Sequence, residues 1–190
     1  MRDADTENVA HRALPLRAAL AADQRIIAPR RAGREGETAA RFYGLSAFTG
    51  STAMAYWLLK SEPAKYSWDQ MVADGRTHWD GVRNFQAANN LRAMKQGDRA
   101  FFYHSNEGKD IVGIVEIVRP FYPDPGDPGG KFGMVDVAPV MPVKQPVSLA
   151  EMTGVPELAG FSLLRQSRLS VCPVSVAEWR VICRMAGIAT

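Results

Sequence analysis

Apolar residues recur in short, regular groups from Tyr56 to the end of the chain, and each group predicts one strand or one helix. The run from Tyr56 to Lys60 is aromatic and aliphatic, which is typical of a strand, and Pro63 ends it. Later apolar runs predict further strands at 99–104, 111–118 and 132–140. A polar hairpin loop at 105–108 joins the first two of these.

Capping boxes mark three helix starts, because a serine there accepts the backbone N–H of a Glu or Gln three residues later. These serines are Ser67, Ser148 and Ser175. Apolar residues spaced three apart between Phe85 and Met94 predict another helix, whose apolar side can lie on a sheet. Short helices interleaved with hairpin-linked strands favour an α+β fold, in which a small mixed or mostly antiparallel sheet closes into a β-barrel with short flanking helices.

The character of the chain changes near residue 54. Residues 1–53 are rich in Ala and Arg without a sustained apolar pattern, so we expect a tail that is mostly disordered. Met54 directly precedes the first strand, so a start site assigned too far upstream would also explain the change. The chain has 190 residues, 46% of them hydrophobic, which is enough for one domain with its own core. We place that domain at 54–187.

The charge of the chain limits how it can contact nucleic acid. The formal net charge is +3, but residues 54–190 carry fifteen Lys and Arg against fourteen Asp and Glu. A protein that neutralises many phosphates of a long duplex would carry a much larger basic excess. Any contact with nucleic acid is therefore expected to be local.

Several classes of protein are excluded by composition. No apolar run is long enough to span a membrane or to form a secretory signal, so a cytoplasmic protein without membrane contact is predicted. We also expect a monomer. Cys172 and Cys183 fall in a predicted buried strand and the helix after it, and free thiols are expected. The three histidines show no ligand spacing, so neither a metal nor a cofactor is predicted.

Polar residues are concentrated at the ends of three predicted elements. The first cluster follows the strand that ends at Lys60, Ser61 and Glu62, and Pro63 fixes its backbone. The second is the glycine-containing turn at 79–84, and the third is the strand end at 101–106. A packed core does not select such residues, which makes these positions candidates for ligand contact.

The same segments resemble the EVE domain family. The resemblance rests on WLLKSEP at 57–63, WDGVRNFQA at 79–87, MKQGD at 94–98 and FYHS at 102–105. It continues through IVGIVE at 111–116 and YPD at 122–124, and covers residues 55–187. It implies a PUA-like barrel and a non-enzymatic module that binds nucleic acid, either DNA or RNA, and recognises a modified base such as 5-methylcytosine or 5-hydroxymethylcytosine.

A base within a duplex exposes only its edges, so close inspection of a modification requires extrusion into a pocket. Aromatic side chains would stack on the base, and polar groups around its edge would supply selectivity. The residues assigned to the base pocket are Trp57, Ser61, Trp79, Asn84, Tyr103, His104 and Ser105. The residues assigned to phosphate or edge contacts are Lys60, Arg83 and Arg168.

Two other functions remain open at this point. A hydrolase of modified nucleosides or nucleotides could use the acid, base and nucleophilic groups of Lys60, Ser61, Glu62, His104 and Ser105, although no nucleophile elbow, phosphate loop or dinucleotide motif is present. A protein-interaction module with a vestigial pocket is the second alternative. At the residue level, Trp57 and Tyr103 could equally be core aromatics, and His104 could be a structural hydrogen-bonding group.

Overall fold

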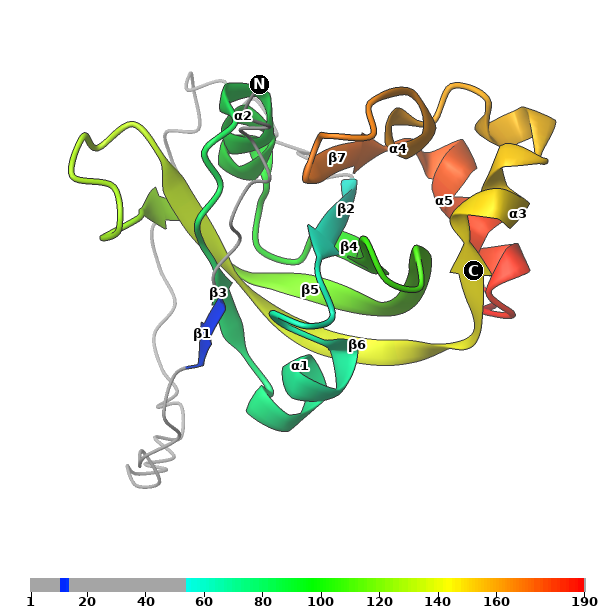
Figure 1. Cartoon of the computed structure of the whole chain (residues 1–190), viewed down its shortest axis with the longest axis horizontal. Helices are drawn as coiled ribbons and strands as arrows, with labels where there is room; N and C mark the ends of the chain where they lie inside the picture. Colours follow the sequence, from blue (N-terminus) through cyan, green and yellow to red (C-terminus); the bar gives the residue numbers. More distant parts are fainter. Residues whose placement is uncertain (1–10, 14–53, 190) are drawn as a thin grey trace, which may run out of the picture. The chain divides into compact units, whose positions relative to one another are not determined.

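The computed structural model describes residues 11–13 and 54–189 (Figure 1). The expectations for the N-terminal tail therefore lie, apart from one short strand, outside the described residues. The strands are β1 (His11–Ala13), β2 (Tyr56–Ser61), β3 (Thr77–Trp79), β4 (Arg99–His104), β5 (Asp110–Pro123), β6 (Gly133–Ser148) and β7 (Val171–Val174). The helices are α1 (Trp68–Asp74), α2 (Phe85–Ala93), α3 (Leu149–Thr153), η1 (Pro156–Leu158), α4 (Ser162–Arg165) and α5 (Val176–Met185).

The strands form one seven-stranded sheet in the order β1-β3-β6-β5-β4-β2-β7. Every pair is antiparallel except β2 and β4, which run parallel. This confirms the predicted α+β class with a mixed sheet. The expected closure into a barrel is not found, because within the described part of the chain the edge strands β1 and β7 do not pair with each other.

The sheet bends along its two longest strands. β5 and β6 pair over most of their length with several register shifts, and such bulges increase the local bend and twist of a sheet. Both strands extend well beyond the segments predicted from sequence, because these shifts let them continue through prolines such as Pro120 and Pro142.

Both faces of β2 and β4 are covered by aromatic residues. On one face, Trp179 of α5 stacks on Tyr56 and Phe101, with ring centroids 4.3 Å and 4.0 Å away. On the other, Phe102 meets the edges of Trp68 and Trp79 at 5.5 Å and 5.7 Å. These central strands are therefore buried on both sides, which explains their nearly continuous apolar sequence.

The second face depends on a close backbone approach at Gly113 of β5. A Cβ atom added there would lie 2.3 Å from the indole of Trp68, so only glycine allows this ring to reach Phe102. The predicted strand correctly included Gly113, but its partner across the core could not be read from the sequence.

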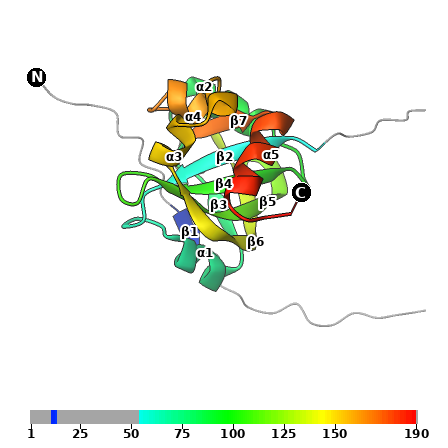
Figure 2. The ribbon, with the colours of Figure 1, turned by 90° about the vertical axis from the view of Figure 1, so that its right-hand side faces the viewer.

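The predicted helix starts are present. Ser148 and Ser175 form complete capping boxes with Glu151 and Glu178, whereas Ser67 accepts the N–H of Gln70 without a reciprocal bond. Figure 2 shows α3, α4 and α5 gathered near β7, so short helices cover this edge of the sheet.

The two thiols are free and buried, as predicted. Burial raises the pKa of Cys172 and of Cys183 to about 11, which keeps both thiols protonated and unreactive at neutral pH.

Candidate nucleic-acid interface

The parallel pairing of β2 and β4 brings five of the ten predicted site residues to one edge of the sheet. The register places Lys60 opposite Tyr103 and Ser61 opposite His104, so both strands end at the same level. The residues gathered there are Lys60, Ser61, Tyr103, His104 and Ser105. We call this group the strand-end cluster. The sequence predicted these residues in two separate motifs, and the register explains why they meet.

The strand-end cluster has two sides, because successive side chains of a strand point to opposite faces. Ser61 and His104 share the face of Phe102, whose ring lies 5.7 Å from that of His104. Lys60 and Tyr103 share the opposite face, towards α5. A ligand at this edge would meet different polar groups on its two sides.

Both serine hydroxyls of the cluster bind backbone carbonyls. The Ser61 hydroxyl donates to the carbonyl of Tyr66 over 2.7 Å, and the Ser105 hydroxyl donates to the carbonyl of Ser61 over 3.2 Å. The Ser105 backbone N–H also donates to Ser61. These bonds fix the segment that leads into α1. They leave the oxygen lone pairs of each hydroxyl as acceptors.

His104 is held in one neutral form. Its Nε2 accepts the backbone N–H of Trp68 at 3.2 Å, so the proton of the neutral ring lies on Nδ1, 4.0 Å from an oxygen of Asp110. Burial lowers the pKa of His104, and the charges of Asp110 and Asp69 oppose that shift without cancelling it. His104 is thus a neutral N–H donor at physiological pH.

Lys60 connects the cluster to the segment that carries Arg168. Its ammonium donates to the carbonyl of Ser167 over 2.9 Å, and its backbone N–H donates to Ser170. Arg168, the next residue after Ser167, is exposed to solvent. Lys60 itself is only 8% exposed, so it positions this segment and is poorly placed to contact a phosphate directly.

Tyr103 is almost completely buried beside Lys60. Burial, together with the charge of Asp110, raises the pKa of Tyr103 to about 12. Its phenol therefore stays protonated and keeps its O–H as a donor.

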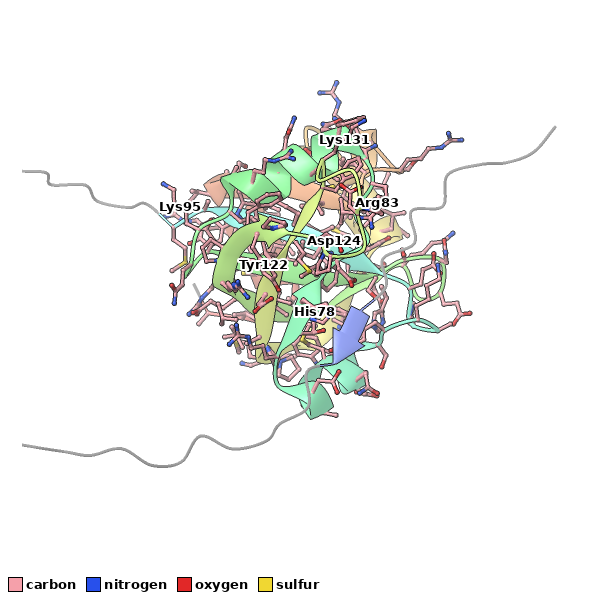
Figure 3. The ribbon with its side chains drawn as sticks, turned by 90° about the vertical axis from the view of Figure 1, so that its left-hand side faces the viewer. His78, Arg83, Lys95, Tyr122, Asp124 and Lys131 are labelled. Atoms are coloured by element: carbon pink, nitrogen blue, oxygen red, sulfur yellow. The ribbon has the colours of Figure 1, made fainter. Side chains whose placement is uncertain are left out.

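Arg83 and Asn84 lie in a second group, at the start of α2. The Arg83 guanidinium donates to Asp124 over 2.7 Å and to the carbonyl of Gly126 over 3.2 Å, which fastens the proline- and glycine-rich loop (Figure 3). The side-chain oxygen of Asn84 accepts the N–H groups of Gln86 and Ala87, so Asn84 is the N-cap of α2. That role occupies its oxygen, and the residue as a whole is exposed to solvent.

Three residues of this group were missed as site residues in the sequence. Asp124 is buried; burial raises its pKa, but hydrogen bonds from Arg83, Gly126 and Gly81 outweigh this and lower it. His78 lies 3.7 Å from Asp80, and burial raises the pKa of Asp80. One Asp80 oxygen is buried without a hydrogen bond from any described residue. The YPD motif contained Asp124 and the turn at 79–84 contained Asp80, whereas no motif quoted from the sequence contained His78.

Both tryptophans that were predicted to stack on the base are core residues. Trp57 is 7% exposed, and its indole N–H donates to Asp98 over 3.1 Å at the opposite end of β2 from Ser61. Trp79 is fully buried and meets the edge of Phe102. The structure therefore separates Trp57 from the other candidates, whereas Phe102 connects Trp79 to His104.

The arrangement offers little support for serine chemistry. The hydroxyl protons of Ser61 and Ser105 go to carbonyls, and His104 accepts from a backbone N–H, so the nucleophile and base of a hydrolase are not paired. Across the described residues, no three His, Cys, Asp or Glu side chains form a group suited to a metal ion. None of the helices at 54–189 has the length and apolar character required to cross a membrane.

The chain is similar to proteins of known sequence and structure. Thymocyte nuclear protein 1 of Rattus norvegicus is 39% identical over 168 residues, which cover 70% of this chain and 74% of the relative. An NMR structure from Rhodopseudomonas palustris is 54% identical over 70% of this chain and 94% of that chain, with a TM-score of 0.68. A crystal structure of human THYN1 protein in complex with 5-methylcytosine containing DNA is 35% identical, with a TM-score of 0.64, and the match covers 72% of this chain and 99% of that chain.

These similarities correct one prediction. A cytoplasmic location was expected, but the rat, human and mouse relatives are named as nuclear proteins. The prediction rested on the lack of a long apolar run, and that property does not distinguish the cytoplasm from the nucleus.

The similarities also agree with the resemblance found in the sequence. The α+β, PUA-like fold that it implied is confirmed by the superposition on the human structures. The sequence profile of the EVE domain matches residues 55–185, which include β2 to β7, the strand-end cluster and all of α5. The chain therefore belongs to the EVE domain family.

Proposed function

We propose that this chain binds nucleic acid and recognises a modified cytosine, of the 5-methylcytosine or 5-hydroxymethylcytosine type, that is extruded from its stack. The observation that carries the proposal is the similarity to human THYN1, whose structure contains DNA with 5-methylcytosine and matches 72% of this chain. Recognition of a base modification requires no covalent step. This agrees with the hydrogen bonds of Ser61, Ser105 and His104, which go to backbone groups and do not join a serine hydroxyl to the histidine.

The strand-end cluster is the proposed contact for the edge of the base. His104 offers an Nδ1–H donor and Ser61 offers a hydroxyl oxygen as an acceptor, on the same side as the rings of Phe102 and Trp79. Ser105, the residue after β4, offers a second hydroxyl oxygen. A cytosine edge carries both donors and acceptors, so this set is complementary to it.

Two cations outside the cluster are the proposed contacts for flanking phosphates. Arg168 is exposed on the segment that Lys60 holds, and Arg83 is partly exposed at the start of α2. Phosphate contacts set orientation and carry no sequence information, so these residues act on affinity more than on selectivity.

The proposal is tested by binding titrations of the whole chain at fixed salt. The ligands are matched oligonucleotides carrying cytosine, 5-methylcytosine or 5-hydroxymethylcytosine, as single-stranded DNA, duplex DNA and RNA. We expect tighter binding of one modified form, and we expect His104→Gln and Ser105→Ala to reduce that preference while the circular dichroism spectrum stays unchanged.

Two arginine variants serve as a matched pair. Arg168→Gln should weaken binding of every oligonucleotide by a similar factor, whereas Arg184→Gln, on an exposed position of α5, should have no effect. Equal affinity for all three bases, or a preference that survives both cluster variants, would contradict the proposed site.

A further inference from the structure

The outer face of α2 carries an exposed aromatic ring and no acidic residue. Phe85 is 64% exposed, the most exposed of the large hydrophobic side chains in the described residues. Gln86, Asn89 and Arg92 are exposed on the following turns, and the helix sequence contains neither Asp nor Glu. The opposite side of the helix packs on the domain through Ala87, Ala88 and Leu91.

The ring of Phe85 packs against the loop between β5 and β6. It lies 5.2 Å from the ring of Phe132, and the guanidinium of Arg83 lies 5.6 Å from the centre of that second ring. Asp127 holds the loop in place by accepting the N–H groups of Lys131 and Phe132 over 2.6 Å and 2.7 Å. Phe85 is therefore a fixed and solvent-facing aromatic surface, and no described residue covers most of it.

Positive charge surrounds this aromatic surface. Arg92 donates to the carbonyl of Lys131 and to the side chain of Asn89, so it links α2 to the loop. Lys131, the neighbour of Phe132 in the loop, and Lys95, beyond the C-terminal end of α2, are exposed, and Figure 3 shows Lys131 near Arg83. The nearby carboxylate of Asp124 is paired with Arg83, and that of Asp127 accepts backbone N–H groups.

We propose that the outer face of α2 binds the unpaired nucleotides that flank the recognised base, with one base stacked on Phe85 and with Arg92 and Lys131 at phosphates. An exposed ring within a cationic surface matches single-stranded nucleic acid, which presents base faces and phosphates together. Seven residues of helix separate Phe85 from Arg92, about 10 Å, a length that spans about three nucleotides of a stacked strand.

This inference rests on the proposed function, because it places a second contact beside the base-reading site. The turn that leads from Trp79 to α2 connects the two contacts, because Trp79 meets Phe102, whose ring also meets His104 of the strand-end cluster. The two proposals differ in what they control. Stacking on Phe85 contributes affinity regardless of base identity, whereas the strand-end cluster controls the preference for the modified base.

The test compares Phe85→Ala with Val176→Ala, a change at another exposed apolar residue, on α5. Whole-chain proteins are titrated with the single-stranded oligonucleotides, with and without the modified cytosine. We expect Phe85→Ala to weaken binding of both by roughly tenfold, with an unchanged ratio between them. Val176→Ala should leave both affinities unchanged, and Phe85→Trp should restore binding.

Phe85→Trp also gives a direct readout of stacking. The four native tryptophans are buried, so an added indole at this exposed position should dominate the fluorescence change on binding. We expect its emission to be quenched when a base stacks on it. Wild-type affinity in Phe85→Ala, together with unquenched emission in Phe85→Trp, would overturn the inference and leave this face for a protein partner. If the preference for the modified base is retained in that case, the proposed function stands. A chain that binds no oligonucleotide would overturn both.

Discussion

At the scale of single residues, His104 makes the stability of the fold depend on pH. Burial lowers the pKa of His104 below its usual value of 6.5, so the unfolded chain takes up this proton at a higher pH than the folded chain. The stability that depends on the neutral ring is complete above pH 6.5 and is lost as the pH falls through the lowered folded-state pKa. We predict that the free energy of unfolding falls as the pH drops below 6.5 and levels off below the lowered folded-state pKa of His104.

The contribution of His104 to this slope can be isolated with His104→Gln, which retains a polar side chain without a titrating ring. Urea unfolding of both proteins across the same pH range gives the difference directly. We expect a flatter pH dependence in the variant. A parallel decline in both proteins would assign the effect to groups other than His104.

Residue identity alone did not distinguish ligand contacts from structural ones. Asn84 was predicted at the pocket because it is polar and follows a glycine turn. In the structure, its side chain caps α2. Small polar side chains perform both tasks by the same hydrogen bonds, so their sequence signals are alike. Asp98 and Asp124 were missed because their partners lie 41 residues away along the chain, a distance that no local pattern covers.

At the scale of elements, Asp98 connects the start of β2 to the turn between α2 and β4. Its carboxylate accepts N–H groups from Ala55, Trp57 and Lys95 over 2.9 to 3.1 Å, and it is 4% exposed. We predict that Asp98→Ala lowers the free energy of unfolding by about 3 kcal/mol, because it leaves buried donors without acceptors. Urea unfolding of the variant measures this loss.

Asp98→Asn is the matched control, since its amide keeps one oxygen acceptor in nearly the same volume. We expect it to be less destabilised than Asp98→Ala. Equal losses in the two variants would show that the carboxylate charge matters more than the number of acceptors.

The prediction of elements succeeded where the local signal was strong. The strand at 99–104 and the helix at 85–93 match their predicted positions closely, and the boxes at Ser148 and Ser175 start helices as expected. The three-residue strand β3 was missed because it is too short for an alternating pattern. The parallel pairing of β2 and β4 that assembles the strand-end cluster depends on register, which has no local signature in either strand.

At the scale of the whole molecule, positive and negative charges nearly cancel, and the proposed phosphate contacts depend on a few individual basic residues. Residues 54–190 carry fifteen Lys and Arg against fourteen Asp and Glu, so no broad positive field is available to attract a duplex. The proposed phosphate contacts are instead a small set: Arg83, Arg92, Lys131 and Arg168. The carboxylate of Asp127 accepts backbone N–H groups, whereas that of Asp124 is paired with Arg83 and offsets part of its charge.

The salt dependence of binding follows from that small set. Each phosphate contact changes the slope of log K against log salt by about −0.7 for single strands and −0.9 for duplex DNA, so four contacts give a slope of about −3. We predict this slope for the whole chain, and a slope shallower by about one unit for Arg168→Gln or Arg92→Gln. Titrations at several salt concentrations measure it. A slope near zero would contradict the assigned phosphate contacts. A slope steeper than about −8 would require a basic surface much larger than these four side chains, such as one that includes the arginines of residues 1–53.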